Sequence, residues 1–591
     1  MNKILSTIVI AAVAAAMTGC DNYDSDYAPE YASVVRIDNA GEQSATVSPK
    51  GESTFDVTLK RSGHDIGQPT QAQVRVMTDD EWNEYAPKYG MAAYNRIPAD
   101  SYSFVTDKAD FAANEMIKNL TINLDGVKLA AYEEALEENV GEDDDDPVIC
   151  LPLCLSTTTT GSVLSEKKDL VLVINMTGTG GISTAAELLK FAQAVNRGKK
   201  ISKWTNEAGE VTLLNDIDMT GTDLWEPIGG VDNSAYSTAA PFVSIRPFKG
   251  VFDGQGHTIK GLNGSCDISN RKVYALFGAV EDATIKNLTV GDKDGNDTWT
   301  FTGVAPQASA FAVIIGAAKN STISNCHNYV NIQFNADNLQ NQTVMLAGVV
   351  GSMENCTVGG DTAAEGCTNH GDNHTGRLTD TACGQTCLLQ GGVVGLVSKH
   401  ETNKVSYCVN YGHISAPACR TGGVIGNLVR GTVYRCDNRG TVEDDRIGQY
   451  DAINDNTKCN YKRMGGIVAG TDDCRLYPAN KIIECTNYGL ILCHTSCRTG
   501  GIVGHNNYAL DGCSNQGIIL GNMYANSHGP GWLCGYCSAS TATWINAQNC
   551  VRGGKLGDYS QYKDNPEAAP ETTNSNAFCY ISTYYNPALN K

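Results

Sequence analysis

The sequence GGVVG at positions 391–395 decides the fold, because close copies of it recur along the chain. Two glycines followed by two β-branched residues appear again from Gly422, Gly465 and Gly500. A second motif, Cys-x-Asn-x-Gly, accompanies these runs and begins at Cys367, Cys408, Cys436, Cys485 and Cys513. Its spacing varies, from 28 residues between Cys408 and Cys436 to 49 between Cys436 and Cys485. A fixed motif at variable spacing indicates stacked coils joined by loops of different lengths.

Stacking would place equivalent residues above one another, because the coils of a parallel β-helix lie about 4.8 Å apart. The isoleucines and valines of the glycine runs are expected to line the core, and the paired glycines to permit close packing. The asparagines are expected to form an amide ladder, and Gly412, Gly440, Gly489 and Gly517 to supply a left-handed turn. The predicted structural ladder comprises Cys408, Asn410, Cys436, Asn438, Cys485, Asn487, Cys513 and Asn515.

The chain holds 22 cysteines, and many of them fall at one place in the repeat. Stacked cysteines would lie near the Cα spacing that a disulfide tolerates. They would equally serve as small buried hydrophobic residues. We favour buried thiols, because a column shared by many coils has no reason to pair in twos.

Residues 1–19 resemble a bacterial lipoprotein signal peptide. Lys3 precedes an apolar stretch, 4–17, that is too short to span a bilayer stably. Met-Thr-Gly-Cys at 17–20 resembles the lipobox, which implies cleavage before Cys20 and lipidation of Cys20; a plain secretory signal is the alternative.

Residues 20–30 begin acidic and resemble the tether that sends lipoproteins of gut Bacteroidetes to the outer cell surface, with an ordinary linker as the alternative. The implied location is the outer membrane, with the protein lipid-anchored and facing the cell exterior.

Residues 31–178 alternate between apolar and polar positions in short runs separated by turn residues, which predicts an antiparallel β-sandwich. Clear examples are 33–37, 54–59 and 169–176. The order of these runs resembles a small immunoglobulin-like domain of unknown function that commonly follows the lipidated cysteine in Bacteroidetes surface glycan-binding lipoproteins.

A helix is predicted next, because Thr184 and Glu187 form a capping box and Gly198 supplies a stop. Its single apolar face suits it to cover the open end of the coils.

Residues 179–262 therefore contain the covering helix and the entry coils, 263–557 the repeats, and 558–591 a tail. The entry sequences, such as FKGVFDGQGHTIKGL at 248–262, resemble right-handed parallel β-helices that carry the glycine-rich GLUG repeat of bacterial surface proteins. The predicted fold class is all-β, with a sandwich, a parallel β-helix and one short capping helix.

The formal net charge of −21 argues against nucleic-acid binding, which needs a basic surface. The sequence lacks HExxH and a nucleophile elbow, and the pectinase signatures of enzymatic β-helices are absent. We therefore predict no catalytic residue, no metal site and no cofactor.

Three arginines, Arg420, Arg463 and Arg498, each lie two residues before a glycine run. In consecutive coils they would form a column able to grip the carboxylates or sulfates of an acidic glycan; the alternative is a solvated face paired with Asp and Glu. Trp532, Tyr411 and Tyr488 are candidates for stacking on sugar rings, with packing against the protein as the alternative.

The leading functional hypothesis is a lipid-anchored surface protein that binds an extracellular polysaccharide, or a host or bacterial surface glycan, without catalysis. Its contact with a membrane would run through the lipid anchor alone. One alternative is a β-helix polysaccharide lyase or glycoside hydrolase, which rests on fold analogy. A structural adhesin is the other.

Overall fold

The computed structural model describes residues 33–581, apart from 64–65, 138–146, 178–179, 207, 231–245, 296, 337–342, 376–387, 417–419, 445–462, 472–480, 495–497, 507–508, 522–529, 538–546, 552 and 572–579. Cys20 lies outside the described residues. The chain divides into two compact units, 1–177 and 178–591.

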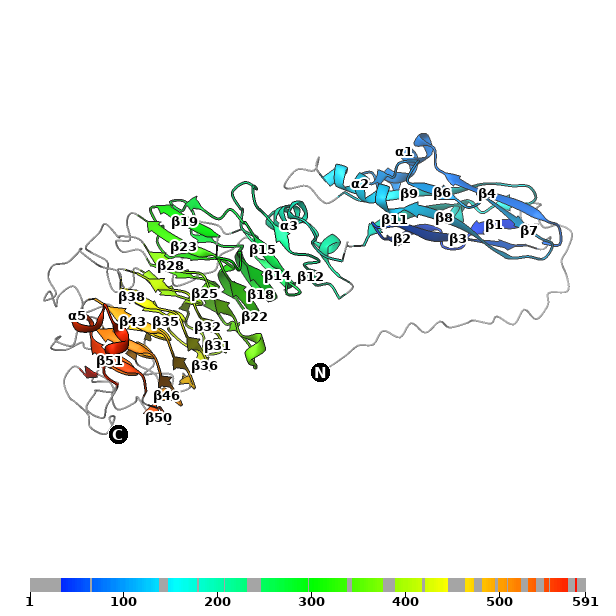
Figure 1. Ribbon diagram of the computed structural model, residues 1–591. Coiled ribbons are helices and arrows are strands. Elements are labelled where there is room, and N and C mark those ends of the chain that lie inside the picture. Colours follow the sequence, from blue (N-terminus) through cyan, green and yellow to red (C-terminus); the bar gives the residue numbers. More distant parts are fainter. Residues whose placement is uncertain are drawn as a thin grey trace. The chain divides into compact units, whose positions relative to one another are not determined.

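The first unit is a β-sandwich (Figure 1). One sheet has the order β10-β1-β3-β8-β6 and contains β1 (Val34–Ile37), β3 (Glu52–Ser62), β6 (Tyr102–Phe104), β8 (Ile117–Asp125) and β10 (Ser162–Val163). The other has the order β2-β11-β9-β4-β7, with β5 beside β9, and contains β2 (Gly41–Val47), β4 (Thr70–Val76), β5 (Asn95–Arg96), β7 (Lys108–Phe111), β9 (Ile149–Thr158) and β11 (Asp169–Met176). Alternate residues of both sheets, such as Leu59 and Leu172, form one core.

Two helices of this unit were not expected from the sequence. The first, α1 (Asp79–Lys88), starts at a capping box in which Thr78 and Glu81 satisfy each other's backbone N–H groups. It buries Trp82 and Ala86 against the outer face of the second sheet. The second, α2 (Gly126–Glu137), directly continues β8 without a turn signal in the sequence. Both are short, and α2 has little amphipathic pattern to reveal it.

The second unit is a parallel β-helix in which all pairings between the named strands of its three sheets are parallel. One sheet contains β17 (Val273–Tyr274), β20 (Ser309–Ala312), β24 (Val344–Ala347), β29 (Leu388–Gly391), β34 (Arg420–Gly422), β39 (Arg463–Gly465) and β44 (Arg498–Gly500). Another contains β16 (Cys266–Asp267), β19 (Thr298–Gly303), β23 (Asn331–Ala336), β28 (Asn373–Thr375), β33 (Ile414–Ser415), β38 (Val442–Asp444), β43 (Leu490–Cys493), β48 (Ile518–Gly521) and β51 (Lys555–Asp558).

The largest sheet receives up to three short strands from each coil. Its members are β12 (Val211–Thr212), β13 (Ile217–Asp218), β14 (Phe248–Asp253), β15 (Thr258–Lys260), β18 (Phe277–Val290), β21 (Ile315–Lys319), β22 (Thr322–Asn328), β25 (Val350–Glu354), β26 (Thr357–Val358), β27 (Thr368–Asn369), β30 (Val394–Val397), β31 (Lys404–Ser406), β32 (Val409–Asn410), β35 (Ile425–Leu428), β36 (Thr432–Tyr434), β37 (Asp437–Asn438), β40 (Val468–Thr471), β41 (Lys481–Ile483), β42 (Thr486–Asn487), β45 (Val503–Asn506), β46 (Ala509–Asp511), β47 (Ser514–Asn515), β49 (Cys534–Cys537), β50 (Ala547–Gln548) and β52 (Tyr580–Ile581). A short helix, α5 (Tyr559–Tyr562), follows β51.

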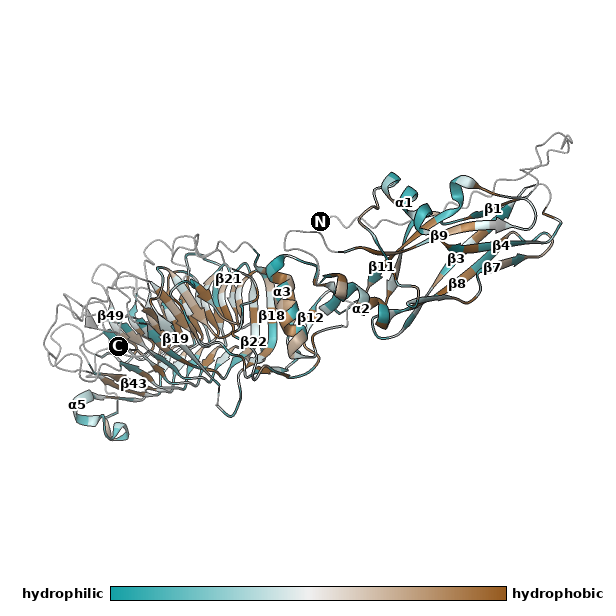
Figure 2. Ribbon diagram, turned by 90° about the horizontal axis from the view of Figure 1, so that it is seen from above, coloured by the Kyte–Doolittle hydropathy of each residue, from teal (hydrophilic) through white to brown (hydrophobic). Residues whose placement is uncertain are grey.

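The helix α3 (Ala185–Arg197) lies at the entry end of the β-helix (Figure 1). It begins at the predicted Thr184–Glu187 capping box and ends at Gly198, whose φ is 69°. Its apolar face meets the first coils, where the ring centroid of Phe191 lies 5.9 Å from that of Phe248 and 6.0 Å from that of Phe252. Hydrophobic strands line the interior beyond it (Figure 2). The all-β prediction, with a parallel β-helix and a covering helix, is confirmed.

The glycines of the Cys-x-Asn-x-Gly motif have a different role from the one predicted. Gly412, Gly440, Gly489 and Gly517 do not have positive φ angles, so they make no left-handed turn. A Cβ on Gly440 would lie 2.0 Å from the carbonyl oxygen of Gly412 in the coil before. These glycines are therefore required by the close approach of successive backbones. The left-handed residues lie just before the cysteines instead, as at Tyr407, Arg435 and Glu484.

Among the described residues, no helix is both long and apolar enough to cross a membrane.

Candidate functional site

A ladder of buried asparagine amides runs through the repeats. The Nδ2 of Asn410 donates to the Oδ1 of Asn438 at 2.9 Å, and Asn438 donates in turn to Asn487 at 2.8 Å. Each amide also donates to a carbonyl two residues ahead, as Asn438 does to Gly440 at 3.1 Å. The same pattern joins Asn328, Asn369, Asn410, Asn438, Asn487 and Asn515, all fully buried. The ladder fixes the coil register and turns the following residue outward.

The cysteines form a second column inside the same corner. Cys408, Cys436, Cys485 and Cys513 are free and fully buried. The backbone N–H of Cys436 donates to the Sγ of Cys485 at 3.4 Å. Burial raises the pKa of the Cys408 and Cys436 thiols, and contact with neighbouring thiols of the column adds to the shift. These residues belong to the scaffold and do not reach a ligand.

The buried thiols lead to a direct chemical prediction. In the native protein, iodoacetamide should leave peptides containing Cys408, Cys436, Cys485 and Cys513 unmodified, because all four side chains are fully buried and the reagent has no access to them. After denaturation the same peptides should be alkylated without prior reduction, as mass spectrometry would show. Disulfide-linked peptides between coils, or alkylation of the folded protein at these positions, would contradict the thiol assignment.

The residues that follow the ladder asparagines make an outward row at the corner of the coils. We call this the corner row, and it comprises Tyr329, His370, Tyr411, Arg439, Tyr488 and Gln516. Each is held by the previous coil; the N–H of Arg439 donates to the carbonyl of Asn410 at 2.7 Å, and the N–H of Tyr488 to Asn438 at 2.8 Å. Tyr411 is 46% exposed and Tyr488 47%. The first two members are half-buried and the others exposed.

The rings of the corner row stack on one another. The centroids of Tyr329 and His370 lie 4.3 Å apart with planes 4° from parallel, and those of His370 and Tyr411 lie 4.6 Å apart at 10°. The guanidinium of Arg439 lies 4.6 Å from the centroid of Tyr488. These spacings match the separation of coils. The stack therefore turns ring edges and hydroxyl groups to solvent and covers ring faces.

This geometry limits the predicted stacking role of Tyr411 and Tyr488 to one ring face each. A sugar that stacks on an aromatic residue needs a free ring face, and one face of Tyr411 is covered by His370, while one face of Tyr488 is covered by Arg439. What the row offers is hydrogen bonding from phenol hydroxyls and a guanidinium. Burial, with a smaller effect of nearby His327, lowers the pKa of His370 to about 4. His370 is therefore neutral at physiological pH and leaves Arg439 as the charged member.

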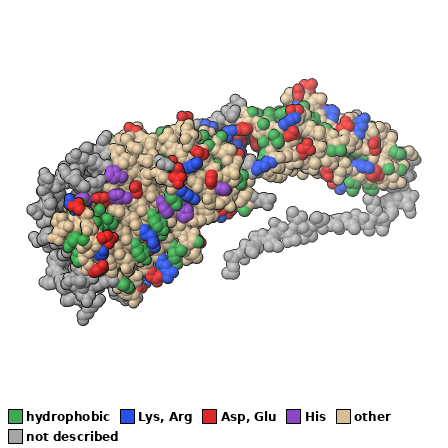
Figure 3. All heavy atoms as spheres, viewed as in Figure 1, with side chains coloured by type: hydrophobic (Ala, Val, Ile, Leu, Met, Phe, Trp, Pro, Cys, Tyr) green, Lys and Arg blue, Asp and Glu red, His purple; other side chains and the backbone are tan. Residues whose placement is uncertain are grey.

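A second aromatic group lies on the largest sheet, which also holds the ladder asparagines. Tyr407 and Tyr434 meet edge to face at 5.4 Å, and the guanidinium of Arg435 lies 5.0 Å from the Tyr434 centroid. Arg435 also forms an ion pair with Glu484 of the next coil. In the face drawn in Figure 3, hydrophobic, basic and histidine side chains lie interspersed over the β-helix. Tyrosine and arginine are both enriched at protein–protein interfaces.

The predicted arginine column exists but lies largely inside the protein. Arg420 pairs in register with Arg463, and Arg463 with Arg498. However, Arg420 is 2% exposed and Arg463 6%. Arg420 donates a hydrogen bond to Asn427 within its own coil. A polymer on the surface therefore does not reach these two guanidinium groups, which corrects the hypothesis of an arginine grip.

The last two predicted contact residues are likewise engaged by the protein. Arg498 is half-buried, with its guanidinium 4.0 Å from the ring centroid of Tyr536. Trp532 is 3% exposed and belongs to the core of the β-helix, so it presents no face to a sugar.

A carboxylate clamp joins three coils on another sheet. Oε2 of Glu443 lies 2.9 Å from Nε2 of His413, and its Oε1 lies 3.1 Å from Nε2 of His494. These two histidines lower the pKa of Glu443 to about 2. No group of three or more His, Cys, Asp or Glu side chains within the described ranges is placed to hold a metal ion.

The clamp predicts a pH dependence of stability. The usual pKa of this carboxyl is 4.5, and in the folded protein its pKa is about 2. Between pH 2 and pH 4.5 the carboxyl is therefore protonated in the unfolded chain and ionised in the folded protein. The contribution of Glu443 to the free energy of unfolding is therefore complete above about pH 4.5 and is lost as the pH falls toward 2. This contribution is at most about 3 kcal/mol. Urea unfolding across this range should show a smaller loss for Glu443→Gln than for the unaltered protein. Equal losses would contradict the clamp.

No protein-family model matches the chain, and no curated protein matches it. Among solved structures, it is similar to a "putative carbohydrate binding protein" from Bacteroides ovatus, with 14% identity, a TM-score of 0.19, and 24% of this chain and 36% of that chain covered.

Two further likenesses have similarly low identities. A multidomain protein including DUF1735 from the same organism has 16% identity and a TM-score of 0.18, with 25% and 46% covered. An IgA1 protease has 11% identity and a TM-score of 0.35, with 66% and 26% covered. The chain spans less than half the length of each of these three proteins, and at these scores the likenesses assign neither family nor function.

Sequence reasoning found two members of the corner row and missed the others. Four members were not predicted, although each directly follows a ladder asparagine as Tyr411 does: Tyr329, His370, Arg439 and Gln516. The signal was present in the motif itself, because its fourth position is one of the two that the repeat leaves variable. Arg435 carried no such signal.

Proposed function

We propose that this chain is a lipid-anchored protein of the bacterial outer surface, with GLUG-type coils, that binds glycans and does not cleave them. The observation that supports it is the corner row, in which Tyr411, Arg439 and Tyr488 present hydroxyl and guanidinium groups at the spacing of the coils. A regular line of hydrogen-bonding side chains suits an extended polymer of repeating hydroxyl groups. Cys20 would carry the acyl chains and hold the protein at the membrane.

Affinity electrophoresis of the full chain through gels containing neutral or acidic polysaccharides tests the binding. We expect at least one polymer to retard the protein, and Arg439→Ala/Tyr488→Ala to weaken its binding about tenfold or more, because a charged hydrogen bond and a phenol hydrogen bond are both removed. Arg197→Ala is the matched control for charge, since Arg197 lies exposed on α3. Retardation by no polymer, or equal weakening in the control, would contradict the proposal.

The same samples separate binding from catalysis. We expect no new reducing ends and no unsaturated products after prolonged incubation with a retained polysaccharide. Either product would establish the lyase or hydrolase alternative. Retention of Cys20→Ala in the membrane fraction, as strong as that of the unaltered protein, would contradict the lipid anchor.

A further inference from the structure

The sandwich unit contains a small pocket beside α1, a helix that was not predicted from the sequence. Its volume is about 260 Å³, and its floor includes the buried side chains of Met77 and Cys154. One wall is formed by Tyr85, which lies in α1, and Tyr89, which directly follows the helix. Their ring centroids lie 4.4 Å apart, and their planes are inclined by 34°. Tyr89 is 53% exposed. Because the two rings are tilted, they overlap only in part, and Tyr89 keeps more than half of its surface open to solvent.

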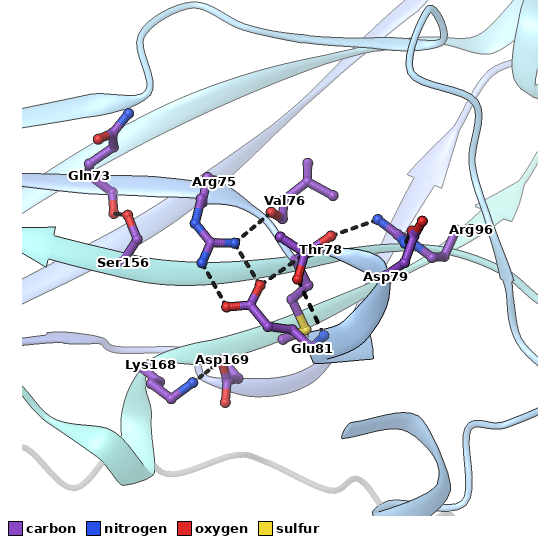
Figure 4. Close-up of polar contacts among 11 residues, drawn as sticks. Gln73, Arg75, Val76, Thr78, Asp79, Glu81, Arg96, Ser156, Lys168 and Asp169 are labelled. Atoms are coloured by element: carbon purple, nitrogen blue, oxygen red, sulfur yellow. Dashed lines mark hydrogen bonds and ion pairs between the residues drawn. The ribbon is translucent and has the colours of Figure 1, made fainter. Parts of the chain in front are cut away.

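The wall is held firmly by charged contacts behind it (Figure 4). Arg75 forks onto Glu81, with nitrogen–oxygen distances of 2.6 and 2.7 Å, and Glu81 also accepts from the N–H of Thr78 at 2.8 Å. Arg96 pairs with Asp79 of the same first turn. The Arg75 contact and the Thr78 N–H lower the pKa of Glu81 to about 2, so this anchor is charged throughout the physiological range. The helix therefore presents Tyr85 and Tyr89 in a fixed arrangement.

The rim of the pocket carries hydrogen-bonding groups that the described part of the protein does not use. Within the described part of the chain, the hydroxyl groups of Tyr85 and Tyr89 and the carboxylate of Glu84 make no hydrogen bond to the protein. Lys88 lies with its Nζ 5.3 Å from the Tyr89 centroid. On the opposite side, Lys168 is paired with Asp169 at 3.1 Å, as Figure 4 shows. Acceptors and donors thus surround an aromatic wall, and the acidic and basic side chains balance.

We propose that this pocket binds a single neutral sugar residue, stacked against Tyr89 and hydrogen-bonded by Tyr85 and Glu84. Its volume lies below the ~300–1,000 Å³ of pockets that enclose drug-sized ligands, which limits it to about one ring. The balanced rim favours a ligand without net charge over a uronate or a sulfated sugar. The proposal deepens the glycan-binding function and rests on it, but the site lies in the other unit and depends on none of the corner-row residues.

Saturation-transfer NMR on the full chain tests it, with methyl glycosides of glucose, galactose and mannose as probes and glucuronate as the charged comparison. We expect saturable binding of at least one neutral glycoside at millimolar concentration, weaker binding of glucuronate, and transfer strongest to the ring protons that face Tyr89. Tyr89→Ala should weaken binding about tenfold by removing the stacking face. Tyr85→Phe, which keeps the ring, should weaken it several-fold by removing one hydrogen bond.

The Arg439→Ala/Tyr488→Ala variant separates this site from the corner row. It should bind the methyl glycosides as the unaltered protein does, even where it has lost polysaccharide. No saturable binding of any neutral glycoside, unchanged binding by Tyr89→Ala, or glucuronate bound as tightly as the neutral glycosides would overturn the proposal. If the protein still bound polysaccharide in that case, the corner row would remain the proposed binding site and only the pocket would be rejected.

Discussion

Gly440→Ala is expected to cost about 4 kcal/mol or more, enough to prevent cooperative folding of the β-helix unit. The added Cβ would lie 2.0 Å from the carbonyl oxygen of Gly412 and 2.8 Å from its carbonyl carbon. Both atoms are backbone and are fixed by the ladder on either side, so no side chain can swing away. Urea unfolding followed by circular dichroism measures the loss.

Gly230→Ala is the matched control in the same unit. Among the described residues, a Cβ there meets nothing within 4 Å, and the φ of Gly230 is not positive, so we expect a change of less than about 1 kcal/mol. Equal stability of Gly440→Ala and the unaltered protein would show that successive coils approach less closely than described.

Asn438→Ala is expected to lower the free energy of unfolding by about 3–5 kcal/mol, because several buried polar groups lose a partner at once. The amide of Asn410 loses its acceptor at 2.9 Å, and Asn487 and Gly440 lose a donor at 2.8 and 3.1 Å. Asn438 is fully buried, so water does not replace these bonds.

Asn438→Asp provides a sharper comparison for the same bonds. The carboxylate has nearly the shape of the amide but donates to neither Asn487 nor Gly440, and it brings a charge into a buried position. We expect Asp to be at least as destabilising as Ala at neutral pH, with partial recovery on acidification as the carboxyl is protonated. Gln516→Ala, in the exposed corner row, should cost little. A tolerated Asp would contradict a closed amide ladder.

Much of the architecture was predictable, because the repeat is a direct record of coil geometry. Isoleucine and valine after the paired glycines, such as Val424 and Ile425, are fully buried as their pattern indicates. The conformation of Gly412 and its equivalents was not predictable, since a glycine is required both for a left-handed turn and for a close approach. Only the distance to the next coil distinguishes the two causes.

The candidate site was harder to predict, because burial and ring orientation depend on neighbouring coils. Arg420 and Arg463 each lie two residues before a glycine run, which predicted a column. That position did not show whether the guanidinium groups point into the protein or to solvent. Tyr411 and Tyr488 were recognisable as corner residues, but their stacking partners come from coils many residues away. The Tyr85–Tyr89 pair depends on α1, a helix that the strand pattern around it concealed.

Hydroxyl-radical footprinting of the full chain, with and without a polysaccharide that retains it, tests the central claim most directly. The account predicts that Tyr411 and Tyr488, both nearly half exposed, lose reactivity when the polymer binds. Tyr102 of the sandwich, which belongs to neither proposed site, should react equally in both states. Full reactivity of Tyr411 and Tyr488 under saturating polymer, with protection elsewhere on the β-helix, would contradict the corner row as the binding surface.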